Sequence, residues 1–168
     1  MKIYIASDHA GFEFKNDIGS RLVKDGYDVE DCGASEFNED DDYPDFIKLA
    51  AKKVSENPDN RGIIMGGSGQ GENIVASKFK NIRSALFYSP VVPKGETDIS
   101  GRTSTDPFEI VKLARIHNDA NVLSIGVRFV TKEEAYQAVK VFLETAFSNE
   151  ERHRRRIDKI TQIENSNE

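Results

Sequence analysis

The chain has 168 residues, of which 38% are hydrophobic and 31% are charged, and its formal net charge is −6. This length predicts a single domain with one buried core, and the negative charge disfavours non-specific binding to nucleic acid or to anionic lipid. No apolar run reaches the roughly 20 residues that cross a membrane, and the amino terminus lacks a secretory hydrophobic region. We therefore expect a soluble, cytoplasmic protein.

Cys32 is the only cysteine of the chain. One thiol can form neither an intramolecular disulfide nor a cysteine zinc site. We therefore interpret Cys32 as a buried structural residue, and the sequence shows no evident set of metal ligands.

The amino-terminal part begins with a strand pattern and continues with a helix pattern. Residues 2–7 predict a strand, after which apolar side chains recur at helical spacing at Phe14, Ile18 and Leu22. Residues 27–32 predict a second, short strand. The acidic run at 39–42 then predicts a solvated loop.

A second helix is expected to begin at Asp42 or Tyr43, because Pro44 favours the first turn of a helix. Its predicted buried stripe consists of Phe46, Leu49, Ala50 and Val54. The apolar run at 62–65 predicts a buried strand that leads into a glycine-rich segment, and a short helix is expected at 74–78.

The carboxyl-terminal half repeats this alternation. Strands are expected at 82–88 and 122–130, with a helix at 108–116 between them. Thr131 and Glu134 match a capping box, which predicts a further helix whose buried side contains Ala135, Val139, Phe142 and Leu143. A basic helix is expected at 150–163, and residues 164–168 are expected to fray.

Alternating strands and helices predict an α/β protein, namely a single-domain, three-layer, Rossmann-like sandwich with a mostly parallel sheet and helices on both faces. Ligands of such sheets bind beyond the carboxyl ends of the strands. The segment 89–107 departs from the pattern, because structureless loops beyond about 12–15 residues are uncommon inside compact domains. We expect it to be a lid, an interface element or a disordered segment.

The segment Gly66-Gly67-Ser68-Gly69-Gln70-Gly71-Glu72 is the most informative local feature. Glycines after a strand leave backbone N–H groups that can close around an anionic oxygen. The spacing fails the dinucleotide fingerprint, lacks the Lys-Ser/Thr ending of a P-loop, and lacks one flanking glycine of a nucleophile elbow. Two interpretations stay open, an anion-binding loop and a tight turn. Glu72 is accordingly either an exposed carboxylate or a base aimed at a ligand.

Asp8 and His9 close the first strand and, in a parallel sheet, lie at the same edge as the glycine-rich segment. Asp8 is either part of a site or a helix cap for the segment that follows Gly11. The motif His117-Asn118-Asp119-Ala120-Asn121 lies between a helix and a strand, where Asn and Asp are ordinary turn residues, and that interpretation leads.

Arg152 and Arg156 share one face of the last predicted helix. Such a basic stripe forms a solvated face, a nucleic-acid contact or a clamp for a phosphate, and the planar arginine fork suits the last two. No aromatic residues alternate with the arginines, so nucleic acid has no further support.

With these residues assembled, the chain resembles the ribose-5-phosphate isomerase B family, which also contains the galactose-6-phosphate isomerase subunits. The resemblance covers nearly the whole chain and rests on five ordered motifs, at 7–11, 42–45, 66–72, 117–121 and 152–156. Many members carry a cysteine base at the position of Gly66, which this chain lacks. It resembles instead the subgroup whose Gly-Gly-Ser-Gly-x-Gly-Glu loop supplies a glutamate base.

The resemblance implies an isomerase that interconverts ribose 5-phosphate and ribulose 5-phosphate through an enediolate, with no cofactor and no metal. It assigns proton transfer between C1 and C2 to Glu72 and stabilisation of the enediolate oxygen to Ser68 and the loop N–H groups. His117, with Asp8, would assist opening of the furanose ring. The implied substrate-binding residues are Asp8, His9, Tyr43, Gly67, Ser68, Gly69, Gln70, Gly71, Asn118, Arg128, Arg152 and Arg156.

The resemblance also implies a homodimer with shared active sites, in which His117, Asn118 and Arg128 reach across the interface. Whether dimers pair further into a tetramer stays open. The expected partner is a small sugar phosphate, and neither nucleic acid nor a membrane is expected. Two alternatives remain: an isomerase for a six-carbon sugar phosphate of the allose 6-phosphate or galactose 6-phosphate type, because the segment 89–107 is longer than in typical members, and a non-catalytic sugar-phosphate-binding protein.

Overall fold

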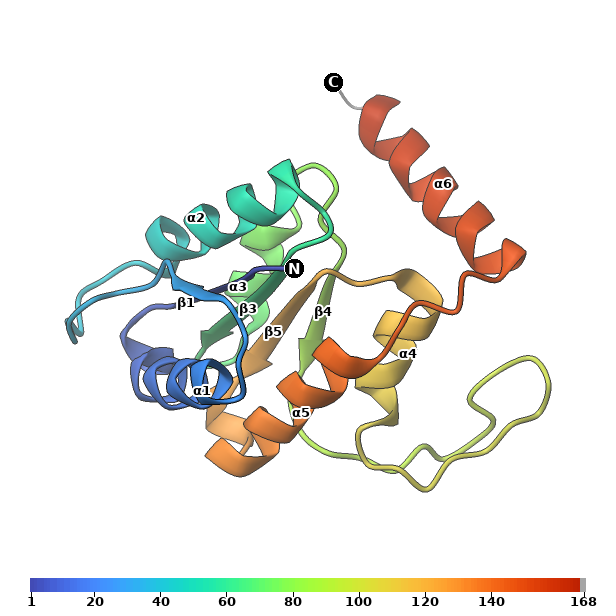
Figure 1. Cartoon of the computed structure of the whole chain (residues 1–168), viewed down its shortest axis with the longest axis horizontal. Helices are drawn as coiled ribbons and strands as arrows, with labels where there is room; N and C mark the ends of the chain where they lie inside the picture. Colours follow the sequence, from blue (N-terminus) through green and yellow to red (C-terminus); the bar gives the residue numbers. More distant parts are fainter. Residues whose placement is uncertain (167–168) are drawn as a thin grey trace.

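The chain forms a five-stranded sheet in a computed structural model that describes residues 1–166 (Figure 1). The strands are β1 (Ile3–Ser7), β2 (Val29–Asp31), β3 (Arg61–Gly66), β4 (Ser84–Phe87) and β5 (Val122–Gly126). They lie in the order β2-β1-β3-β5-β4, and every neighbouring pair is parallel. The predicted parallel α/β sheet is confirmed.

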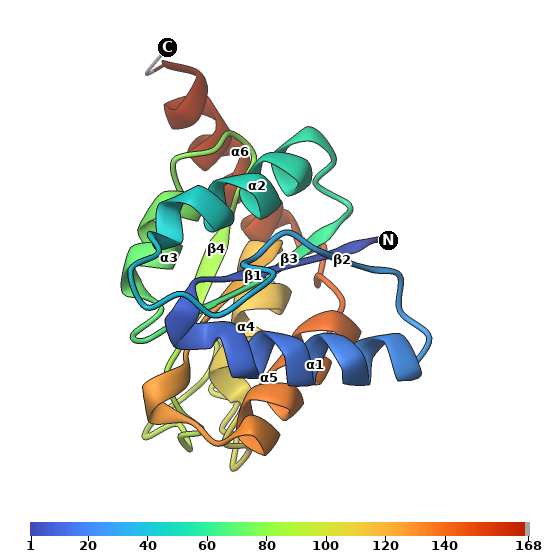
Figure 2. The same ribbon diagram turned by 90° about the vertical axis from the view of Figure 1, so that its left-hand side faces the viewer.

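Helices cover both faces of this sheet (Figure 1 and Figure 2). One face carries α1 (Phe12–Lys24), α4 (Glu109–Asn118) and α5 (Lys132–Glu144), and the other carries α2 (Tyr43–Glu56) and α3 (Gln70–Ala76). Successive strand residues point to opposite faces, so Ile63 and Met65 join the first core and Ile64 joins the second. The predicted three-layer sandwich is confirmed.

The buried side of α2 differs from the predicted stripe. Its buried residues are Ile47, Ala50, Ala51 and Val54. Leu49 is 45% exposed and Phe46 is partly exposed, so the prediction was wrong for these two. Both sets have helical spacing, and periodicity alone could not choose between two adjacent faces of the same helix.

β5 is shorter than the predicted strand at 122–130. Its pairing with β3 ends where Gly126 lies opposite Gly66, and Val127–Phe129 form a turn of 3-10 helix. The backbone N–H of Arg128 donates to the carbonyl of Gly67 at 3.2 Å. The chain therefore crosses over the glycine-rich segment after β5 instead of continuing as a strand.

The last helix, α6 (Glu151–Ser166), projects from the rest of the molecule (Figure 1). Within it His153 is buried, whereas Ile160 and Ile163 are exposed. The Glu164 carboxylate accepts hydrogen bonds from the backbone N–H of Asn81 at 2.9 and 3.0 Å. Residues 164–166 are therefore helical where fraying was predicted, and 167–168 lie outside the described residues. No helix within 1–166 has the length and apolar character needed to cross a bilayer.

Residues 88–108 join β4 to α4 as the long yellow-green loop in Figure 1. The loop is held by its own hydrogen bonds: both the backbone N–H and the hydroxyl of Thr97 donate to the carbonyl of Arg102, at 2.6 and 2.9 Å. The Arg102 guanidinium in turn donates to Asp98 at 3.1 Å and to Glu109 at 2.6 Å. These bonds favour a structured element, and its role as a lid or an interface stays a prediction.

Replacing Arg102 with alanine is expected to loosen this loop. Burial raises the pKa of Glu109, but the hydrogen bonds from Arg102 and Ser104 outweigh it and leave the pKa below its ordinary value. Without Arg102 the Glu109 carboxylate loses the hydrogen bond and the positive charge that offset the cost of burying it. Limited proteolysis within 89–107 should become faster by about threefold or more, and the Tm should fall. Exposed Lys94→Ala is the control, and equal cleavage of both variants would show that Arg102 does not brace the loop.

Candidate active site

Asp8 follows the carboxyl end of β1 and is only 5% exposed. Its Oδ1 accepts hydrogen bonds from the backbone N–H groups of Ala10 and Gly11, at 3.0 and 3.4 Å. Asp8 therefore caps the 3-10 turn His9–Gly11. The prediction that it caps the helix after Gly11 was wrong, because α1 has Gly11 as its N-cap and no side-chain cap. The charge of the Asp8 carboxylate also raises the pKa of Glu72, which indicates that the two side chains lie near each other. A cap and a place at the site are thus compatible.

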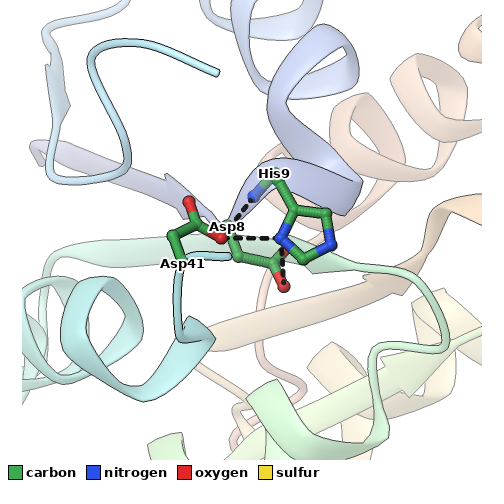
Figure 3. Close-up of side chains that lie close together, drawn as sticks. All are labelled: Asp8, His9 and Asp41. Carbon is green, nitrogen blue, oxygen red and sulfur yellow. Dashed lines mark hydrogen bonds and ion pairs between the residues drawn. The ribbon is translucent and has the colours of Figure 1, made fainter. Parts of the chain in front are cut away.

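Asp41 binds His9 at two points (Figure 3). Its Oδ1 accepts a hydrogen bond from the backbone N–H of His9 at 3.0 Å and lies 2.7 Å from ring Nδ1. The sequence predicts a solvated loop at 39–42, but the Asp41 side chain is only 8% exposed. The available signal was topological: a loop from a parallel strand to the next helix ends at the carboxyl edge of the sheet, where ligands bind.

Asp8, His9 and Asp41 offer ligand atoms that all lie within 4.8 Å of one another, a spacing that suits a metal ion. The Asp41–His9 hydrogen bond accounts for part of this arrangement, because it engages Nδ1 of the ring. Only Nε2 of His9 is then left as a nitrogen ligand. The expectation that the site works without metal or cofactor stays a prediction.

Glu72 lies in the first turn of α3 and is only 4% exposed. Burial raises the pKa of its carboxyl and the charge of Asp8 raises it further, against the opposing effect of the Glu72 backbone N–H. Of the two interpretations of Glu72, exposure is therefore wrong. A buried carboxyl whose pKa is shifted toward neutrality is suited to exchange protons with a bound ligand.

The Glu72 carboxylate lies directly against the backbone of Gly66. A Cβ built on Gly66 would overlap Oε1 and Cδ of Glu72. A side chain at position 66 and the carboxylate of Glu72 therefore compete for the same space. This overlap is a steric reason why the glutamate base that the resemblance implies at position 72 goes with a glycine at position 66.

Two further loop glycines lie under predicted site residues. A Cβ on Gly67 would lie 2.9 Å from the guanidinium carbon of Arg128, and a Cβ on Gly71 would lie 2.6 Å from the ring of Tyr43. Arg128 therefore contacts the loop of its own chain. The resemblance implies instead that Arg128 reaches across the interface to a partner chain. Both side chains can approach the loop only because these positions lack side chains.

The loop also makes a tight turn. Gly69 has a φ of +71°, which favours glycine, and a Cβ there would lie 2.9 Å from the backbone of Ile125 and Gly126. Half-buried Ser68 accepts a hydrogen bond at Oγ from the backbone N–H of exposed Gln70 at 3.3 Å. The tight-turn interpretation is confirmed, and whether the loop binds an anion stays a prediction.

His117 and Asn118 lie at the opposite edge of the sheet, where the amino-terminal ends of the strands are. They end α4, which runs antiparallel to the strands, and the Asn118 carbonyl accepts a hydrogen bond from Nε of Arg83, just before β4. The ring of His117 lies against that of His153, with centroids 4.4 Å apart. Burial lowers the pKa of His117, and the charges of His153 and Arg152 lower it further.

The structure thus separates the predicted site residues into two groups. The loop group at the carboxyl ends of the strands contains Asp8, His9, Tyr43, Gly67, Ser68, Gly69, Gln70, Gly71, Glu72 and Arg128. The helix-end group at the opposite edge contains His117, Asn118, Arg152 and Arg156. Because helices of a parallel α/β sheet run back against the strands, one chain cannot bring the end of α4 to its own glycine-rich loop.

Cys32 lies away from both groups, in the core beneath α2. The residue is 8% exposed, and burial raises the pKa of its thiol to about 11. A thiol in this state is a poor nucleophile. The interpretation of Cys32 as a buried structural residue is confirmed.

One family model covers the glycine-rich loop, the strand-end Asp-His pair and the first part of the basic last helix. The sequence model of the ribose/galactose isomerases matches residues 3–95 and 102–160. The chain belongs to the ribose/galactose isomerase family. The family model passes over residues 96–101, which form the tip of the long loop.

Full-length relatives in the isomerase family agree with this assignment. Ribose-5-phosphate isomerase B of Mycolicibacterium paratuberculosis is 39% identical over 168 residues, which cover 100% of this chain and 94% of that protein. The crystal structure of ribose-5-phosphate isomerase B from Mycoplasma genitalium with bound ribulose 5-phosphate superposes with a TM-score of 0.84 at 38% identity, covering 98% of this chain and 96% of that one. The Clostridium thermocellum ribose-5-phosphate isomerase B structure also gives 0.84, at 36% identity and 100% coverage of both chains.

Proposed function

We propose that this isomerase interconverts ribose 5-phosphate and ribulose 5-phosphate, with Glu72 as the base. The observation that carries the proposal is the Glu72 carboxyl, buried against Gly66 and close to Asp8 with a raised pKa. It is supported by relatives that are named ribose-5-phosphate isomerase B and by the M. genitalium structure that holds ribulose 5-phosphate.

The proposed reaction needs only proton transfers. The Glu72 carboxylate takes the proton from C2 of the open-chain aldose, and the electron pair of that bond forms the C1–C2 double bond while the aldehyde oxygen becomes negative. Ser68 and loop N–H groups stabilise this enediolate. The hydroxyl proton on O2 moves to O1, and Glu72 returns its proton to C1, which leaves a ketone at C2.

The proposed phosphate contacts combine the two groups of residues. His9 and Arg128 come from the loop group, and Arg152 and Arg156 come from the helix-end group of a second copy of the chain. That second copy also supplies His117, which with Asp8 assists ring opening, and Asn118, which contacts the sugar hydroxyls. A lowered pKa keeps His117 neutral at physiological pH, so its imidazole can accept a proton. A homodimer with shared sites is therefore part of the proposal, and its proposed location is the cytoplasm, as the sequence predicts.

A six-carbon sugar phosphate is the alternative substrate. It is favoured by the loop at 88–108, whose tip the family model does not match. The Tyr43 ring lies on Gly71, where it can line the sugar site. The named relatives favour the five-carbon substrate, which we therefore place first.

Proton NMR of ribose 5-phosphate in D2O with the purified protein tests the reaction. Appearance of ribulose 5-phosphate, with solvent deuterium entering at carbon, supports the proposal. Turnover of only allose 6-phosphate or galactose 6-phosphate in parallel tubes would move the claim to a six-carbon substrate. No turnover of any of them would favour a sugar-phosphate-binding protein.

A shared site predicts recovery of activity by mixing two inactive variants. Glu72→Gln breaks the loop group and His117→Ala breaks the helix-end group, so a mixed dimer keeps one intact site. Co-refolded variants should recover about a quarter of the wild-type rate, because half of the dimers are mixed and each has one working site. A mixture of Glu72→Gln with Gly66→Ala should show no recovery, because the second substitution displaces Glu72 and both variants are therefore defective in the loop group. Equal rates from the two mixtures would contradict a site shared between chains.

A further inference from the structure

We propose that Asp41 is a positioning residue that holds His9 with Nε2 turned toward the phosphate of the substrate and favours the charged form of its imidazole. The inference rests on the proposed function, in which His9 contacts that phosphate. It adds a residue within the acidic run 39–42, 32 residues from His9 in sequence.

The geometry sets the orientation of the ring. Asp41 Oδ1 accepts from the backbone N–H of His9 and lies 2.7 Å from Nδ1, so it holds both the main chain and the ring. An ionised carboxylate only accepts hydrogen bonds, and Nδ1 must therefore carry a proton. The second ring nitrogen, Nε2, points away from Asp41 (Figure 3). A substrate oxygen can reach His9 at this nitrogen.

Asp8 cannot replace Asp41 in this role. Its Oδ1 is engaged by two backbone N–H groups, and its Oδ2 lies 3.9 Å from Nδ1 of His9, which is too long for a hydrogen bond. The side chain of Asp41 is also nearly buried, which strengthens its interaction with the ring. Asp8 adds charge, and Asp41 adds both charge and direction.

Three charged residues act on His9. The hydrogen bond to Asp41 raises the pKa of His9, burial lowers it, Asp8 raises it, and Arg128 lowers it. The edge-on ring of Phe37, with its centroid 6.3 Å from that of His9, adds no charge. His9 and Arg128, which are both proposed to bind the substrate phosphate, repel each other electrostatically when no phosphate is bound. The Asp41 carboxylate at Nδ1 offsets that repulsion and keeps His9 charged to higher pH.

The first test is an NMR titration of the His9 ring in the presence of EDTA, which removes adventitious metal ions. The chain has three histidines, and His9→Gln identifies the signal. In Asp41→Asn the amide can keep the hydrogen bonds but loses the charge, so the His9 titration should move to lower pH. Exposed Asp40→Asn removes the same charge one residue away and should leave the titration unchanged. An unchanged titration in Asp41→Asn would overturn the inference.

The second test is the pH dependence of KM for ribose 5-phosphate. At pH 8 the KM of Asp41→Asn should exceed that of wild type by about fivefold or more, whereas at pH 5.5 the two should agree within about twofold, because His9 is then charged in both proteins. The kcat should stay within about twofold, since no bond to the reacting carbons is touched. Asp41→Ala also frees the ring and should raise KM at both pH values.

The outcomes separate this inference from the proposed function. An equal rise in the KM of Asp41→Asn at both pH values, or a fall in kcat alone, would overturn the electrostatic role. If wild type turns over no ribose 5-phosphate, the proposed function fails. The titration of His9 and its response to inorganic phosphate then still decide the role of Asp41: a response at Nε2 that weakens in Asp41→Asn supports it, and an identical response in both proteins overturns it.

Discussion

Glu72→Gln is expected to lower kcat for ribose 5-phosphate by about 10²–10⁴-fold, the usual contribution of a positioned acid–base group. Glutamine has the shape of glutamate but cannot take the C2 proton, so KM should change little. Proton NMR in D2O measures both turnover and deuterium uptake, and both should be lost together. Glu36→Gln, in an exposed loop, is the matched control and should behave as wild type.

The raised pKa of Glu72 also predicts how activity and stability depend on pH. The carboxylate is the active form, so kcat/KM should fall as pH drops through a pKa above that of an exposed glutamate. A folded-state pKa above the unfolded-state value means that the buried charge costs stability as pH rises between the two. Glu72→Gln should therefore keep or raise the Tm at neutral pH. Activity above about a tenth of wild type would exclude Glu72 as the base, and a Tm lowered by more than about 4 °C would attribute the loss to unfolding.

Gly66→Ala is expected to lower kcat by about 10²-fold without unfolding the protein, because a displacement of about 1 Å in a catalytic group has an effect of this size. The added Cβ would overlap the Glu72 carboxylate, which is the far end of a flexible side chain and can rotate away. The fold can therefore accept the methyl group at little cost. The base cannot keep its position.

Gly95→Ala is the control for this substitution, because a Cβ at that position meets nothing within 4 Å. Steady-state kinetics and thermal unfolding of both variants give the comparison. We expect unchanged kinetics for Gly95→Ala and a loss confined to kcat for Gly66→Ala. Wild-type kcat in Gly66→Ala would show that catalysis does not depend on where Glu72 now lies.

Local patterns in the sequence were sufficient for the order of strands and helices and for the fold class. They did not fix every boundary, because α3 begins at Gln70 where a helix was predicted at 74–78, and β5 ends at Gly126. The capping box is confirmed, because Thr131 and Glu134 lie three residues apart and satisfy each other within one turn of helix. The alternation of strands and helices likewise predicts a parallel sheet, since parallel strands need a crossover between them. Glu72 and the glycine-rich loop could be selected as candidates because they follow directly from one strand.

Only the tertiary structure decided which distant residues meet. Arg128 lies over Gly67 because β5 is the neighbour of β3 in the sheet, and β3 and β5 are not consecutive strands in the sequence. Asp41 reaches His9 because the loops after β1 and β2 end at one edge of the sheet. The buried face of α2 was chosen in the same way, by what it packs against and not by its own periodicity.

The separation of the loop group from the helix-end group is likewise a property of the assembled sheet. Each motif is visible in the sequence, but its edge of the sheet depends on the direction in which α4 runs and on where β5 ends. Periodicity reports which face of an element is apolar, and it contains no information about the neighbour that covers that face. Contacts between elements, set by strand order and packing, therefore decided the candidate site.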